Sequence, residues 1–241
     1  MDTKIDWGDE AERILHHSQH PVADMIVMGS RGLSPLQGLF LGSVSHKVFH
    51  LAECTCATVH AGRDHPGLER LDRVLIAHDG SDHAKKALEL GADLAARFDA
   101  EVVLLHVTLR NASAEQLLRS CDPDHLDGAT RQNLERAVED SAVAVGGVPA
   151  WIPLVDSDIE SVGKCILAEA EDTARANGVA KVTSKVVDGD PARRILDAAE
   201  HESADLIVMG MRGLGEVAGM LVGSVSYKVS HLARATCIAV R

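Results

Sequence analysis

Glycine and serine residues recur in this chain with a spacing that could cradle a phosphate group. In two segments an apolar run ends in Gly-x-x-Gly, nine residues follow, and Gly-Ser-x-Ser then opens a helix-like stretch. Glycine can adopt positive φ and lets the main chain approach a ligand closely, while the free amides and dipole of a helix start attract anions. The candidate phosphate-binding residues are Gly29, Gly32, Gly42, Ser43 and Ser45 in the first segment, and Gly210, Gly213, Gly223, Ser224 and Ser226 in the second.

The same residues also have a purely structural interpretation. The glycines could be turn residues, and Ser224 or Ser226 could cap a helix. Each element alone is more typical of that role, whereas the full spacing, present twice, favours phosphate binding in the second segment. The pattern is not a Walker loop, because no Gly-Lys-Ser/Thr follows, and it lacks the Gly-x-Gly-x-x-Gly of dinucleotide-binding folds.

The two segments belong to an internal duplication. Residues 23–59 align with residues 204–240 without a gap, with 22 of 37 positions identical at a constant offset of 181. Residues 9–15 match residues 190–196 at the same offset, and the elements that precede this point in the second copy have no counterpart in the first. We therefore expect a partial domain at residues 1–62, a linker at 63–69 and a complete domain at 70–241.

The complete domain alternates between strand-like and helix-like segments. Apolar runs at residues 74–77, 101–107, 181–187, 205–209 and 237–240 are separated by stretches with helical periodicity. This order predicts an α/β fold with a five-stranded parallel, doubly wound sheet, whose ligands bind at the carboxyl ends of the strands. Residues 109–156 are polar and rich in breakers, and we interpret them as an irregular insertion.

The partial domain is too small to bury a core of its own. We expect its two strands to pack on the complete domain, with the strand at residues 56–60 beside the strand at 237–240. Such an arrangement would form a pseudo-dimer within one chain and would cover an otherwise exposed strand edge. It leaves open whether two chains also form a homodimer.

Composition excludes several classes of partner. The net charge of −12 argues against nucleic acid, which requires a positive surface, and no apolar run approaches the roughly 18 residues of a membrane span. The acidic first residues do not match a signal peptide, so the expected location is the cytoplasm. The five cysteines are an odd number and irregularly spread. We interpret them as reduced thiols and expect no metal site.

Four motifs carry a resemblance to a known family. They are VLIAHDGS at residues 74–81, LLHV at 104–107, GDP at 189–191 and the glycine pattern itself. In this order they resemble the ATP-binding subgroup of the universal stress protein family, with an adenine nucleotide α-hydrolase-like fold. The resemblance implies that ATP, ADP or AMP binds, either alone or together with Mg²⁺. The implied nucleotide contacts are Ala77, His78, Asp79, Val107, Met209, Gly210, Gly213, Gly223, Ser224, Val225 and Ser226.

The chemistry of these residues is compatible with that assignment. The carboxylate of Asp79 could accept hydrogen bonds from ribose or the adenine amino group, and Val107 could supply an apolar wall. Asp79 could equally cap the helix that begins near Ser81. Arg212 could face a phosphate or point outward. The partial domain has no counterpart of Asp79 or Val107, so we expect weak or no nucleotide binding there.

Three functions are compatible with the sequence. The favoured one is an ATP-binding regulator of stress responses that acts through an unidentified protein partner. The second is a slow ATPase, for which Glu216 is the sole acidic residue between residues 210 and 226. The third is a dimerising scaffold that binds no nucleotide. The sequence favours a binding protein over an enzyme.

Overall fold

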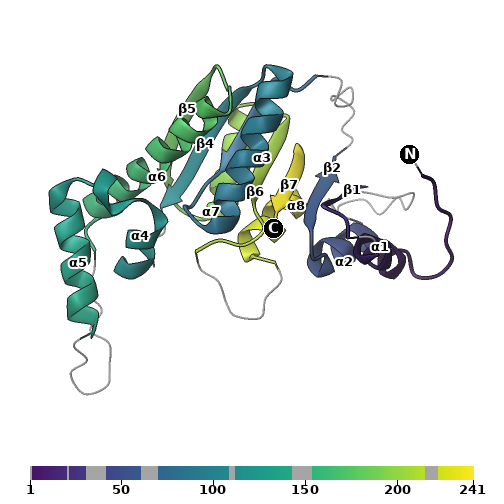
Figure 1. The fold of residues 1–241 in the computed structure, drawn as a ribbon, viewed down its shortest axis with the longest axis horizontal. Helices are drawn as coiled ribbons and strands as arrows, with labels where there is room; N and C mark the ends of the chain where they lie inside the picture. Colours follow the sequence, from purple (N-terminus) through teal and green to yellow (C-terminus); the bar gives the residue numbers. More distant parts are fainter. Residues whose placement is uncertain are drawn as a thin grey trace.

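The computed structural model describes residues 2–20, 22–30, 42–60, 70–108, 112–142, 154–214 and 222–241. Within these residues one seven-stranded sheet runs through both copies, in the order β1-β2-β7-β6-β3-β4-β5. Figure 1 shows the partial copy at one end of this sheet and the helices of the insertion at the other. None of the helices within the described residues combines the length and the apolar character that crossing a bilayer requires.

The strands confirm an α/β fold with a mostly parallel sheet. Parallel pairing joins the neighbours within each copy, and the two copies meet where β2 pairs with β7 in antiparallel fashion. The five strands of residues 70–241 lie together as expected, and the two strands of the partial copy extend the same sheet, because β2 pairs beside β7 and covers its edge. The strands are β1 (Met25–Gly29), β2 (Thr55–Val59), β3 (Arg73–Ala77), β4 (Glu101–Thr108), β5 (Val182–Asp188), β6 (Leu206–Gly210) and β7 (Thr236–Val240).

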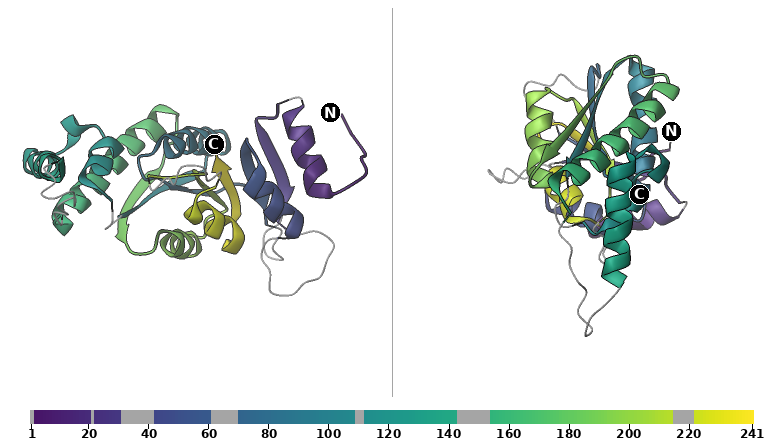
Figure 2. Two further views of the ribbon diagram at one scale, coloured as in Figure 1. Left: turned by 90° about the horizontal axis from the view of Figure 1, so that it is seen from below. Right: turned by 90° about the vertical axis from the view of Figure 1, so that its left-hand side faces the viewer.

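Helices cover both faces of the sheet, as the left view of Figure 2 shows. Successive side chains of a strand point to opposite faces, so Val74 and Ile76 pack under α3 and α6, whereas Leu75 and Leu105 pack under α7 and α8. The chain order reverses between β3 and β6, which places their carboxyl ends side by side. The covering helices are α3 (Asp82–Phe98), α6 (Asp156–Ala176), α7 (Pro191–His201) and α8 (Ser224–Leu232).

The insertion is helical in its described part, so its interpretation as irregular is wrong. A capping box formed by Ser113 and Gln116 starts the first helix, and Leu117 and Leu134 pack against Ile166 of α6. These apolar residues form a core of their own beyond the sheet. The insertion contains α4 (Ala114–Ser120), the 3-10 helix η2 (Pro123–His125) and α5 (Gly128–Ala142).

The partial copy shares its core with the complete domain. Its helices α1 (Glu10–Gln19) and α2 (Ser43–Leu51) cover β1 and β2 on one face. Phe49 of α2 is fully buried, and the cluster around it includes Met211 and Ala239 of the complete domain. The small fragment is therefore stabilised by apolar surface that the larger domain supplies.

The contact between the copies has two-fold pseudosymmetry. Ala57 of β2 pairs with Ile238 of β7, and these residues occupy equivalent positions of the duplicated sequence. On the neighbouring helices, His46 Nε2 lies 2.9 Å from the hydroxyl of Tyr227, again across equivalent positions 181 residues apart. The two copies thus meet as the subunits of a symmetric dimer would, through the same surface on each side.

We expect Tyr227→Phe to lower the free energy of unfolding by about 0.5–1.5 kcal/mol, because it removes the hydroxyl that contacts His46. Urea denaturation of both proteins measures the difference. In a His46→Leu background the same tyrosine change should cost almost nothing, since the partner is already gone. An equal loss in both backgrounds would contradict the assigned contact.

Candidate functional site

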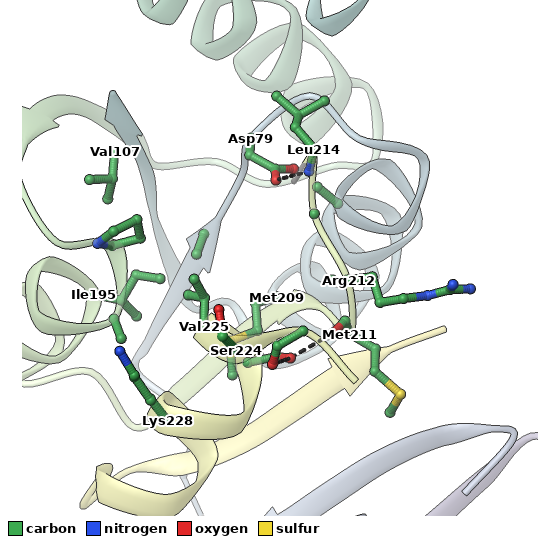
Figure 3. A pocket seen from close by; sticks show the side chains of 18 of the residues that line it. Asp79, Val107, Ile195, Met209, Met211, Arg212, Leu214, Ser224, Val225 and Lys228 are labelled. Atoms are coloured by element: carbon green, nitrogen blue, oxygen red, sulfur yellow. Dashed lines mark hydrogen bonds between the residues drawn. The ribbon is translucent and has the colours of Figure 1, made fainter. Parts of the chain in front are cut away.

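A cavity of about 530 Å³ opens at the carboxyl ends of β3 and β6, where the chain order reverses. The loops after these two strands and the first turns of α7 and α8 surround it, as Figure 3 shows. This is the position at which doubly wound sheets bind ligands. Every implied nucleotide contact lines the cavity: Ala77, His78, Asp79, Val107, Met209, Gly210, Gly213, Gly223, Ser224, Val225 and Ser226.

The glycines of the loop after β6 are required by space and not by positive φ. A Cβ on Gly210 would lie 2.8 Å from the carbonyl oxygen of Arg212 and 2.9 Å from the amide nitrogen of Ala84 at the start of α3. A Cβ on Gly213 would overlap Oδ2 of Asp79. The expectation of positive φ at these positions was therefore wrong, whereas the expectation of close main-chain approach holds.

Asp79 joins the two loops. Its Oδ2 accepts a hydrogen bond of 3.0 Å from the amide of Leu214, and its Oδ1 accepts bonds from the amide and hydroxyl of Ser81 at 3.1 and 2.6 Å. Ser81, not Asp79, caps α3, because its side chain accepts from the amide of Ala84. The helix-cap alternative for Asp79 is thus wrong, and the carboxylate faces the glycine loop across the cavity mouth.

The opposite wall of the cavity is apolar. Val107 at the end of β4, Ile195 of α7 and Met209 of β6 are buried and line it. In Figure 3 the side chains of Val107 and Ile195 stand on the side away from Arg212. A flat, weakly polar group would find dispersion contacts here, with polar groups available only at the edges.

The glycine–serine pair marks the start of α8 at the cavity. Gly223 occupies the N-cap, and its amide donates to the carbonyl of Met211 at 2.9 Å. Ser226 Oγ donates to the carbonyls of Met211 and Gly223 at 2.6 and 3.0 Å, so this side chain holds the loop in place. Ser224 is the first helical residue and is exposed to the cavity. The first amides of a helix lack intrahelical acceptors, which makes this end suited to an anion.

Sequence reasoning missed Lys228 as a cavity residue. It lies on α8, four residues after Ser224, and therefore on the same face of the helix. The signal was available, because Lys47 occupies the equivalent position of the first copy. Arg212 also lines the cavity, although Figure 3 shows its side chain extending away from Ser224 and Val107.

The insertion contacts both loops of the cavity. The side-chain amide of Gln116 donates to the carbonyl of Leu214 at 3.0 Å. Gly80 has a φ of +83°, and a Cβ there would overlap the carbonyl oxygen of Ser120 at the end of α4. The helix α4 therefore supports the loop that carries Asp79 and the loop that carries the glycines.

Two buried histidines lie behind the loop after β3. His106 Nδ1 is 2.9 Å from the carbonyl oxygen of His78, and its ring packs against Gly163 of α6. Burial lowers the pKa of both His78 and His106. Their imidazoles are therefore neutral at pH 7 and serve as packing and hydrogen-bonding groups.

The partial copy contains the same hydrogen bonds that hold the glycine loop in the complete domain. Ser45 Oγ donates to the carbonyls of Ser30 and Gly42, each at 3.0 Å, as Ser226 does in the complete domain. Gly42 is the N-cap of α2, and Ser43 is its first residue. Gly29 ends β1, and Gly32 lies outside the described residues.

Comparison with known proteins agrees with the fold and the motifs. The model of the "Universal stress protein family" matches residues 2–60 and 70–241, so the chain belongs to this family. It is 31% identical to the universal stress protein YxiE of Bacillus subtilis over 172 residues, which cover 70% of this chain and 99% of that protein.

Longer relatives match more of the chain. A universal stress protein of Mycolicibacterium smegmatis is 30% identical over 221 residues, covering 91% of this chain, which spans 62% of the length of that relative. The crystal structure of a universal stress protein from Archaeoglobus fulgidus superposes with a TM-score of 0.57 at 25% identity, over 96% of this chain and 64% of that one.

We expect Gly213→Ala to destabilise the protein by about 1–3 kcal/mol, because the added methyl group overlaps Asp79 and breaks its bond to the amide of Leu214. Thermal unfolding measures the loss. Gly128→Ala is the matched control, since a Cβ at that helix position meets nothing within 4 Å. Equal stability of the two variants would show that the close approach at Gly213 is absent.

We also expect the free energy of unfolding to fall as the pH is lowered below about 6.5, where an unfolded histidine binds a proton. The folded state keeps His78 and His106 neutral because burial lowers their pKa, so the unfolded state binds more protons in this range. His106→Asn should reduce the loss between pH 7.5 and pH 5.5, measured by urea denaturation. His20→Gln, at an exposed position, should not reduce it.

Proposed function

We propose that the cavity binds an adenine nucleotide, with ATP as the first candidate. The observation that carries this proposal is the meeting of Asp79 with the glycine loop across a cavity that has one apolar wall and ends at the start of α8. These three features fit the three parts of a nucleotide: the base, the sugar and the phosphates.

The base and the ribose fit the first half of the cavity. Val107 and Ile195 offer an apolar surface of the kind on which adenine packs. An ionised carboxylate has about four lone-pair positions, and three protein donors occupy those of Asp79, so one position remains for a ribose hydroxyl. Asp79 would then accept a hydrogen bond from the ribose while it keeps its hydrogen bond from the amide of Leu214.

The phosphates fit the second half. The start of α8 offers main-chain amides and the positive end of the helix dipole beside the hydroxyl of Ser224. Lys228, one turn further along α8, adds a cation to the lining of the cavity. The carboxylates that line the cavity, Asp79 and Asp190, both accept hydrogen bonds from main-chain amides. A Mg²⁺ ion would therefore be held mainly by phosphate oxygens.

We propose that nucleotide occupancy is read by a protein partner during stress. Gln116 and Ser120 of the insertion contact the two loops that would close on a ligand, so a shift of either loop reaches the surface of α4. The alternative of slow hydrolysis depended on Glu216, which lies outside the described residues. Nothing in the described cavity favours hydrolysis over binding.

Nucleotide titration of the full chain, stripped of carried-over ligand, tests the proposal. We expect ATP to raise the thermal midpoint, since a ligand at about 100 times its Kd adds about 2.7 kcal/mol of stability. Calorimetry should find one site per chain, because the partial copy lacks the base-binding half. No shift at millimolar ATP, ADP or AMP would reject nucleotide binding.

Matched lysine variants test the orientation of the ligand. Lys228→Ala should weaken ATP binding several-fold and leave adenosine binding unchanged, because only the phosphates would contact the amine. Lys164→Ala, on the exposed surface of α6, is the control and should change neither. Gly223→Val should abolish ATP binding, since its Cβ would already lie 3.1 Å from the carbonyl of Met211.

A further inference from the structure

A second cluster of reactive side chains lies where the insertion meets α6. One ligand atom each of Cys121, Cys165 and Glu169 lies within 4.8 Å of the others. Both cysteines are reduced and buried, and neither lines the nucleotide cavity. The sequence did not reveal this cluster, because the two cysteines are far apart in the chain and belong to no spaced Cys-x-x-Cys motif.

The two elements position these groups in complementary ways. Cys165 and Glu169 are four residues apart on α6, so they share one face of the helix, with Sγ 3.8 Å from Oε1. Cys121 follows the last residue of α4, and the packing of Leu117 on α6 brings it to this face. The groups are therefore held by the core of the insertion and not by a surface loop.

A fourth candidate ligand stands beside the cluster. His125, the last residue of η2, places Nδ1 at 3.2 Å from Oε1 of Glu169. The amide of Asp122 donates to the same oxygen at 2.7 Å, which fixes the carboxylate. Two sulfur atoms and one carboxylate oxygen thus converge, and the imidazole of His125 stands beside the carboxylate.

We propose that Cys121, Cys165 and Glu169 bind a Zn²⁺ ion, and that a turn of the neighbouring His125 side chain supplies the fourth ligand. Zinc prefers four thiolate, imidazole or carboxylate ligands in tetrahedral geometry, at about 2.0–2.3 Å from the metal. Ligand atoms of such a site lie roughly 3.3–3.8 Å from one another, as follows from those bond lengths and the tetrahedral angle. The separations of 3.8 Å between Cys165 and Glu169 and of 3.2 Å between His125 and Glu169 are close to these values.

A disulfide between the two cysteines is the competing interpretation. It would use the sulfur atoms alone, and it gives no role to the carboxylate held beside them or to the histidine that contacts it. A metal ion uses all four groups. It would also fasten the end of α4, whose Ser120 carbonyl supports Gly80 beside the nucleotide cavity.

Titration of the reduced, metal-free full chain with Co²⁺ tests the proposal. We expect one Co²⁺ per chain, with visible tetrahedral bands and near-ultraviolet thiolate bands that Zn²⁺ abolishes on addition. Zn²⁺ should also raise the thermal midpoint, and a chelator should reverse the rise. Absence of thiolate bands, or a wild-type chain that binds no metal and forms a Cys121–Cys165 disulfide, would overturn the proposal.

Variants assign the ligands. Cys121→Ser and Cys165→Ser should lose the thiolate bands, whereas Cys54→Ser, at a cysteine outside the cluster, should keep them. His125→Ala and Glu169→Gln should weaken binding by about tenfold or more, since even changes beyond the direct ligands have effects of that size. Circular dichroism checks that each variant is folded. Bands retained in the Cys121→Ser/Cys165→Ser double variant would place the metal elsewhere and refute the site.

Discussion

The close approach of two loops at the centre of the sheet is the constraint on which the candidate site depends. The chain that leaves β6 runs against the start of α3 and against Asp79, and side chains at Gly210 or Gly213 would prevent this. The contact brings a carboxylate, free helix amides and an apolar wall to one cavity. The insertion reinforces the contact from outside through Gln116 and Ser120. The groups that this cavity offers to a ligand come from main-chain geometry more than from reactive side chains.

Periodicity and spacing predicted the parts of the fold that short-range physics determines. The sequence predicted the strand–helix alternation of the complete domain, because burial leaves a local pattern of apolar residues. It also predicted the start of α7 at Asp190 and Pro191, because capping depends on neighbouring residues. The helices of the insertion were not predicted. The helix-breaking residues at Cys121 to Pro123 favoured an irregular segment, so the capping box at Ser113 and the helical spacing of apolar residues from Leu117 to Leu134 were overlooked. The proximity of Cys121 to Cys165 depends on tertiary packing, which no local pattern encodes. Lys228 was hidden because a lone lysine on a helix is usually a solvated one.

The two copies share the hydrogen bonds that hold the loop but differ in the charged groups around the equivalent lysine. Ser45 and Ser226 hold their loops by the same pair of hydrogen bonds. Lys228 faces a cavity, whereas its counterpart Lys47 lies 3.2 Å from carboxylate oxygens of both Asp9 and Glu12. A phosphate at the first copy would have to compete with two carboxylates for that amine. The first copy therefore has the same loop architecture, but its lysine on α2 pairs with carboxylates at the start of α1.

Because β2 pairs with β7, the partial copy cannot finish folding until the end of the second copy has been synthesised. The partial copy is synthesised early, yet the strand edge and much of the apolar surface that complete it belong to residues near 211 and 239. At about 5–20 residues per second, the nascent fragment waits on the order of ten seconds or more before its partner emerges. During that interval Phe49 and Val48 lack the apolar surface of the later copy, so this stretch of the nascent chain cannot yet bury its apolar side chains fully.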